Sequence, residues 1–180
     1  MDKETKLKIK AYGKLYEDWK RKEKIIENDF GESRKVSRYL KRAMDDFLLA
    51  TAVKNLIETS EIRLELGLPK DYKNLYHWLI IISYYSMYHA ATAAIAKKKI
   101  KSDEHEATIA SLAKHYVIAE ELEFDFIKTL SYIYITYIEG GRDKRRKAQY
   151  NVDIEYAKQE AYEVFEDAKK FVKRLQELLE

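Results

Sequence analysis

The chain contains very few residues that break helices: one proline, Pro69, and five glycines among 180 residues. Proline and glycine are the strongest local interruptions of regular structure, so their scarcity favours long helices. No segment shows the apolar–polar alternation that is typical of a half-buried strand. The sequence therefore predicts an all-α fold in which helices pack on one another around a shared core.

Apolar residues recur at helical spacing along most of the chain. The pattern predicts helices over residues 3–28, 34–66, 74–98, about 103–117, 124–139 and 153–180. Ser33, Ser102 and Asp153 are the expected N-caps, since their side chains can accept bonds from the free amides of a first turn. Gly67 and the Gly140–Gly141 pair are the expected helix ends. We expect an up-and-down bundle of about five to six helices.

Residues 74–98 are apolar on nearly every side, which is typical of the most buried helix of a bundle. Small residues at 90–94 would let a neighbouring helix approach closely. The most apolar run, residues 79–82, is too short to span a bilayer, so we expect no membrane association. Residues 1–32 are lysine-rich and are interpreted as a helical arm added to a bundle of residues 33–180.

The composition narrows the class of protein further. The chain has no cysteine, which excludes disulfides and thiolate metal sites. The first ten residues lack the apolar core of a signal peptide, and we expect a cytoplasmic protein. A composition rich in Lys, Glu, Ile and Tyr fits a thermophile.

The segment GGRDKRRKAQYN, residues 140–151, concentrates positive charge between two helical patterns. Guanidinium groups bind phosphate in a bidentate way, and a tyrosine ring can stack on a base. The candidate nucleic-acid or nucleotide contacts are Arg142, Lys144, Arg145, Arg146, Lys147, Tyr150 and Asn151. The alternative is a solvated loop in which Tyr150 packs on the bundle and Arg145 has a structural role.

The four histidines do not predict a metal site. His105 and His115 lie ten positions apart on one predicted helix, about 15 Å by helical rise, so they cannot share a metal within one chain. His89 falls on the most buried helix and is interpreted as a core or interface residue with a satisfied side chain. Tyrosines 84, 85 and 88 are assigned to core or dimer packing. We expect no metal and no cofactor.

Three segments resemble, in order, elements of HEPN domains, a helical family named for nucleotide binding in higher eukaryotes and prokaryotes. Residues 84–95, YYSMYHAATAAI, resemble the family's YYAMFHAA helix, and residues 102–117 resemble the next helix, with its early His and its KH(F/Y)V ending. Residues 145–150, RRKAQY, resemble the RxKADY element that precedes the last helix. The resemblance covers residues 34–180 and is to the small stand-alone prokaryotic members.

The resemblance implies a small helical bundle that forms a homodimer. In many members an Arg and a His after a short spacer form a metal-independent RNase site at the dimer interface, and many are toxins encoded beside a small nucleotidyltransferase. Here no His follows Arg142 or Arg145, and Tyr150 and Asn151 stand in its place. Proton transfer near neutral pH is the natural role of His, so the family's standard nuclease mechanism is not expected.

The sequence thus predicts an RNA- or nucleotide-binding protein of a toxin–antitoxin or related defence module. One alternative is a protein-interaction module that docks an acidic partner such as a nucleotidyltransferase. A second alternative is a metal-independent RNase with a non-standard site, for which Arg145 and Tyr150 are the candidate catalytic residues.

Overall fold

The computed structural model describes residues 3–70, 72, 74–139 and 154–180. Within these residues the regular structure is helical apart from two strands of two residues each, which confirms the predicted all-α bundle. The helices are α1 (Lys3–Arg21), α2 (Phe30–Ser33), α3 (Val36–Glu58), α4 (Ser60–Glu65), α5 (Asn74–Lys97), α6 (His105–Leu112), α7 (Phe124–Ile133) and α9 (Ile154–Leu179). Two π-helical segments, η1 (Ala113–Val117) and η2 (Tyr134–Glu139), continue α6 and α7.

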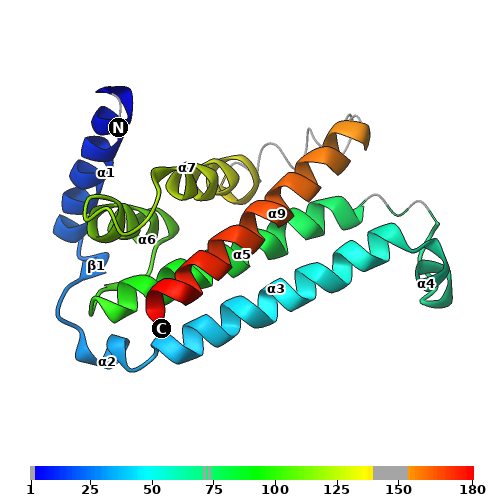
Figure 1. Ribbon diagram of the computed structural model, residues 1–180, viewed down its shortest axis with the longest axis horizontal. Helices are drawn as coiled ribbons and strands as arrows, with labels where there is room; N and C mark the ends of the chain where they lie inside the picture. The colour runs from blue at the N-terminus through cyan, green and yellow to red at the C-terminus, as the bar shows by residue number, and fades with distance from the viewer. Residues whose placement is uncertain (1–2, 71, 73, 140–153) are drawn as a thin grey trace.

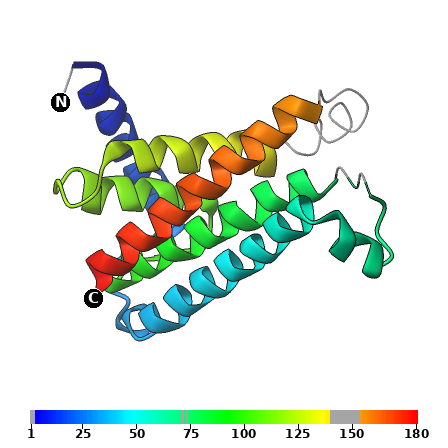
Figure 2. The same cartoon turned by 45° about the vertical axis from the view of Figure 1, so that its right-hand side comes forward.

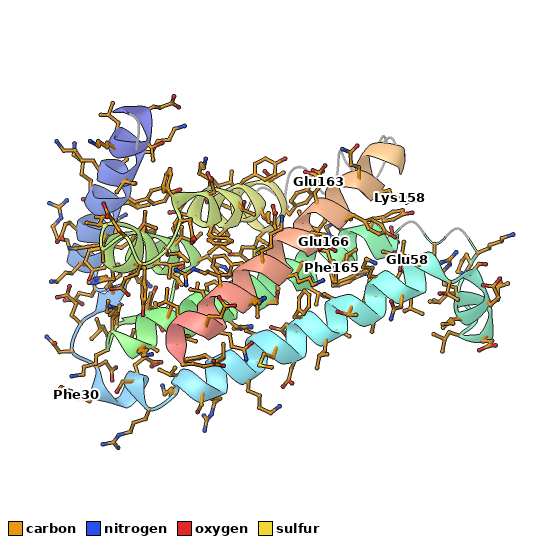
Figure 3. All side chains as sticks on the ribbon, in the orientation of Figure 1. Phe30, Glu58, Lys158, Glu163, Phe165 and Glu166 are labelled. Carbon is orange, nitrogen blue, oxygen red and sulfur yellow. The ribbon has the colours of Figure 1, made fainter. Side chains whose placement is uncertain are left out.

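Three long helices, α3, α5 and α9, run side by side, with α5 packed along both of the others (Figures 1 and 2). Helices α6 and α7 pack against α5, and α1 lies outside them, against α6 and η1. Phe47 of α3 stacks on Phe165 of α9, with ring centroids 5.1 Å apart. Phe165 points from α9 toward α3 in Figure 3. The core therefore centres on α5.

Helix α5 is the most deeply buried element, as predicted. Its fully buried residues include Tyr84, Met87 and the alanines at 90, 91, 93 and 94. By length and composition it is the one helix in the described part of the chain that could cross a membrane, and 67% of its apolar window is buried inside the bundle. Such burial is typical of the core helix of a bundle, where apolar residues on every side meet protein.

The prediction of one helix over residues 3–28 is wrong at its end. Helix α1 stops at Arg21, and Glu23 and Asn28 adopt positive φ angles of 58° and 62°, which a helix does not allow. Ile25–Ile26 instead form strand β1, which pairs antiparallel with β2 (Lys101–Ser102). Ile25 is buried in this pairing. The apolar pair Ile25–Ile26, which continues the helical pattern in the sequence, therefore belongs to a strand.

The other predicted boundaries also need correction. The helix expected over residues 34–66 breaks at Thr59, whose extended backbone separates α3 from α4. Ser33 ends α2 rather than capping α3; Asp29 is the cap, and its carboxylate accepts from the Glu32 amide. Ser102 lies in β2, and α6 begins after Glu104 with no side-chain cap. Gly67 has the expected positive φ, 71°, at the end of α4.

A hydrogen-bonded carboxylate ties α1 to the loop that follows it. Glu27 accepts hydrogen bonds from the Lys20 ammonium and from the hydroxyl of Tyr16, which is fully buried. These two bonds lower the pKa of Glu27 below its ordinary value of 4.5. Burial, and then the bond to Glu27, raise the pKa of Tyr16. The ionised form of Glu27 is therefore favoured by folding.

We expect Glu27→Gln to lower the free energy of unfolding by about 1–3 kcal/mol near pH 7, because two bonds to a charged acceptor are weakened. A depressed folded pKa means that ionised Glu27 stabilises the fold above its unfolded pKa, near 4.5, and that this contribution is lost as the pH falls through the folded value. Urea unfolding near pH 7 and near pH 3 measures the effect. The difference in free energy of unfolding between wild type and Glu27→Gln should be smaller near pH 3 than near pH 7.

The matched control is Glu4→Gln, which removes a carboxylate from an exposed i,i+4 pair with Lys8 on the same helix. Exposed pairs contribute little, so we expect a change within about 0.5 kcal/mol. A Glu27→Gln deficit of equal size at both pH values would contradict the assignment of the effect to the ionised carboxylate.

Candidate functional site

All the binding residues predicted from the sequence, Arg142, Lys144, Arg145, Arg146, Lys147, Tyr150 and Asn151, lie outside the described residues, as does the predicted cap Asp153. The structure describes the chain on both sides of this basic segment, which we define as residues 140–151. On one side η2 ends at Glu139, and on the other α9 begins at Ile154. The role of the basic segment stays a prediction.

A cluster of titratable side chains, most of them aromatic, lies where η2, α5, α3 and the start of α6 meet. We call it the histidine–tyrosine cluster, and it consists of Asp46, Tyr84, Tyr85, Tyr88, His89, His105 and Tyr134. These residues come from four separate elements, α3, α5, α6 and η2, so the cluster forms only when the chain folds. Sequence reasoning assigned the tyrosines and His89 to packing and did not join them to His105.

His105, the first residue of α6, is held between aromatic rings. Tyr88 and Tyr134 stack on the imidazole, with ring centroids 4.2 Å and 5.2 Å away and interplanar angles of 22° and 12°. The Nδ1 atom of His105 is 2.6 Å from the hydroxyl of Tyr84. Stacking on two faces and one hydrogen bond fix both the position and the rotation of this half-buried ring.

His89 of α5 is oriented by a carboxylate of α3. Its Nδ1 atom lies 2.6 Å from Oδ2 of Asp46, and the two side chains are 13% and 25% exposed. The ring of His89 also contacts Tyr88 and Tyr85, with centroids at 5.7 Å and 6.1 Å. Both of these tyrosines contact His105 as well, so the two histidines flank the same pair of rings.

The hydrogen-bond partners assign different tautomers to the two histidines. Asp46 can only accept when ionised, so Nδ1 of His89 carries the proton and Nε2 keeps a free lone pair. Tyr84 is fully buried, and within the described residues Nδ1 of His105 is the partner of its hydroxyl. Donation by Tyr84 satisfies that hydroxyl, which leaves the proton of neutral His105 on Nε2.

Burial shifts the pKa values of the two histidines and of three tyrosines of the cluster toward their neutral forms. It lowers the pKa of His89, against the opposing effect of Asp46, and a nearby Arg42 lowers it further. Burial also lowers the pKa of His105. Burial raises the pKa of Tyr84 and raises that of Tyr134 to about 12, so both hydroxyls keep their protons near neutral pH.

The remaining histidines take structural positions. The ring of His115 meets Tyr16 edge-on, with centroids 5.3 Å apart, and its buried Nε2 has no hydrogen-bond partner in the described part of the chain. His77 lies near the start of α5, beside Trp78. Among the described residues no group of three His, Asp or Glu side chains is arranged to hold a metal ion.

A groove of about 610 Å³ runs between α1, α6 and the α7–η2 segment, and one edge of it is formed by Tyr134 of the cluster. Most of its lining is apolar, with Glu106 and Lys128 among the charged residues. Burial, and then the charge of Glu139, raise the pKa of Glu106. Through Tyr134, the cluster therefore borders a surface depression.

The fold and the cluster define a small helical protein with a polar aromatic site. The chain is 27% identical over 109 residues to a protein of Methanocaldococcus jannaschii named "Putative toxin MJ0142", a match that covers 61% of this chain and 69% of that protein. No known protein family matched the chain. No solved structure matched it. The chain is thus similar to a toxin-like small protein.

Proposed function

We propose that this protein is a HEPN-type component of a toxin–antitoxin or related defence module, and that it binds RNA or a nucleotide through the basic segment. The observation that carries the proposal is the position of the histidine–tyrosine cluster. Tyr134 of η2 belongs to this cluster, and η2 ends at Glu139, directly before the basic segment. The similarity to a protein named as a toxin supports the same class.

The chemistry of the two parts is complementary. The basic segment supplies guanidinium and ammonium groups that can neutralise phosphates. The cluster supplies half-buried tyrosine and histidine side chains, which are able to stack on bases or exchange protons. A single-stranded RNA would use both kinds of contact.

The proposal includes a homodimer, with a nucleotidyltransferase as the partner protein, as the HEPN resemblance implies. The outer face of α3 supports self-association, because Met44, Leu48 and Leu49 are 42%, 66% and 53% exposed there. Exposed apolar patches of this kind commonly mark protein contacts. A monomeric mass in light scattering would contradict the homodimer.

The test is charge reversal of the basic segment. We expect the triple variant Arg142→Glu, Arg145→Glu, Arg146→Glu to bind a single-stranded RNA at least tenfold more weakly, because phosphate contacts dominate such binding. The slope of log affinity against log salt should also become shallower by about 2, since each contact with single-stranded nucleic acid contributes about 0.7. Fluorescence anisotropy at several salt concentrations measures both quantities.

The matched control is Lys6→Glu, Lys10→Glu, Lys14→Glu, which makes the same charge change on the exposed face of α1. An equal loss in both variants would show an effect of net charge rather than a contact. Absence of RNA and nucleotide binding by the wild-type protein at low salt would contradict the proposal, and would favour the alternative of a protein-docking module.

A further inference from the structure

We propose that helix α1 of one copy of this protein docks in a groove between α7 and α9 of a second copy. The groove has a volume of about 600 Å³, and residues of both helices line it. Its charge is opposite to that of the exposed face of α1. This inference goes beyond RNA binding, and the contact uses a different surface from the α3 face of the proposed homodimer.

The groove carries a row of carboxylates along α9. Glu160, Glu163 and Asp167 line it at positions i, i+3 and i+7, so they lie on one face of the helix. The row is about 10 Å long by helical rise. On the opposite wall Asp125 and Lys128 of α7 form an ion pair with each other. The carboxylate row therefore gives the groove a net negative charge.

Two carboxylates of the row have only neutral partners. The hydroxyl of Tyr132 donates to Glu160 at 3.0 Å, and the side-chain amide of Gln159 donates to Glu163 at 2.9 Å. Within the residues that the structure describes, neither glutamate forms an ion pair. Their negative charges are therefore available to a cationic partner.

The third carboxylate, Asp167, is half-buried and weakly paired. The ammonium of Lys170 is 3.9 Å from it. Burial raises the pKa of Asp167; Lys170 opposes this shift, and the negative charge of Glu163 adds to it. A cation in the groove favours the ionised forms of both carboxylates, because it offsets their mutual repulsion.

The floor of the groove is apolar. Ile133 is fully buried, Val164 is 5% exposed, and the ring of Tyr132, which also lines the groove, is 51% exposed. A partner that fits this groove therefore combines a row of positive charges with an apolar side chain.

The outer face of α1 has this complementary pattern. Lys6, Lys10 and Lys14 are exposed at positions i, i+4 and i+8, over about 12 Å of the helix. None of the three forms an ion pair with another described residue. Leu7 lies beside this row and is 62% exposed. The lysine row matches the carboxylate row in length and opposes it in charge.

The lysine row faces away from its own bundle. The opposite face of α1 carries Ile9 and Tyr16, which are buried in the core, and Tyr12, whose hydroxyl is 2.7 Å from that of Ser131. Helix α1 lies at the edge of the molecule, against α6 and η1 (Figure 1). A carboxylate row can therefore approach these lysines from a second copy.

The contact is expected to be weak and sensitive to salt. Each exposed ion pair contributes little, and salt screens it. We therefore expect this association at high protein concentration and low salt. An RNA titration at low protein concentration does not populate it, so the α1 variant remains a valid control there.

The experiment reverses the charge of each surface in turn. It starts from a background protein whose α3 face is made polar by Leu48→Gln and Leu49→Gln, two exposed positions. In that background the α1 variant carries Lys6→Glu, Lys10→Glu and Lys14→Glu. The groove variant carries Glu160→Lys, Glu163→Lys and Asp167→Lys. Light scattering at several protein concentrations measures the self-association constant of each.

We expect each variant alone to associate at least about tenfold more weakly than the background protein, because like charges then face each other. An equimolar mixture of the two variants should recover the association, since each reversed α1 then meets a reversed groove. A misfolded variant could not be rescued in this way. Raising the salt from about 50 mM to about 500 mM should weaken the association of the background protein and of the mixture.

The matched control reverses three exposed carboxylates of α9 that do not line the groove: Glu166→Lys, Glu177→Lys and Glu180→Lys. We expect its association constant to stay within about threefold of the background protein. An equal loss in the control and in the groove variant would show an effect of net charge and would overturn the docking contact.

The outcomes separate this inference from the proposed function. A background protein that stays monomeric at low salt refutes the α1 contact and leaves RNA binding and the α3 homodimer standing. Failure of the mixture to associate also refutes the contact. Loss of association in the groove variant alone, with none in the α1 variant, shows that another basic surface occupies the groove and overturns the choice of α1.

Discussion

Phe171→Ala is expected to lower the free energy of unfolding by about 3–5 kcal/mol. Phe171 of α9 is fully buried, and its ring meets Phe126 edge-on with centroids 5.4 Å apart. Truncation removes the burial of an aromatic ring and leaves a cavity in a core that can relax only partly. Urea unfolding followed by circular dichroism measures the change.

Phe30→Ala is the matched control. Phe30 is 60% exposed on α2, and the ammonium of Lys99 lies over its ring. We expect a loss below about 1 kcal/mol, since a surface ring stabilises little by burial. If Phe30→Ala and Phe171→Ala lowered the free energy of unfolding by similar amounts, the burial of Phe171 by the packing of α9 on the core would be contradicted.

Ala94→Leu is the second large effect. Ala94 is fully buried on α5, and its carbonyl accepts a hydrogen bond from the buried hydroxyl of Tyr116 at 2.7 Å. The added side chain has no space in this close packing and must displace its neighbours. We expect a loss of about 1–3 kcal/mol, measured by thermal unfolding as well as by urea.

The same substitution on a surface separates overpacking from a general effect of leucine. Ala52 is exposed on α3, and Ala52→Leu is expected to change stability by less than about 0.5 kcal/mol. An Ala94→Leu protein as stable as wild type would contradict the close approach of helices around α5.

Several helices could be predicted because their signals are local. The apolar character of residues 74–98 follows from burial on every side, and it predicted both α5 and its central place. Gly67 ended α4 through its own positive φ. Such features depend on residues that are neighbours in the chain, so periodicity and turn chemistry reveal them.

The errors at residues 25–26 and at Ser102 share one cause, which is competition from partners far away in the sequence. Ile25 and Ile26 continue a helical apolar pattern, yet pairing with Lys101 and Ser102 makes them a strand. Ser102 has a side chain suited to an N-cap, but its backbone forms part of strand β2 and pairs with β1. Local propensity is a weak preference, and tertiary contacts override it at these positions.

The sequence by itself determined the class of fold, the buried central helix and the concentration of positive charge at residues 140–151. Only the tertiary structure decided which side chains meet in the histidine–tyrosine cluster. Asp46 and His89 are 43 positions apart, and Tyr84 and His105 are 21 apart. Periodicity shows which face of a helix is buried. The tautomer of a histidine depends instead on which atom forms a hydrogen bond with its ring nitrogen, and the packing of separate helices brings that atom into place.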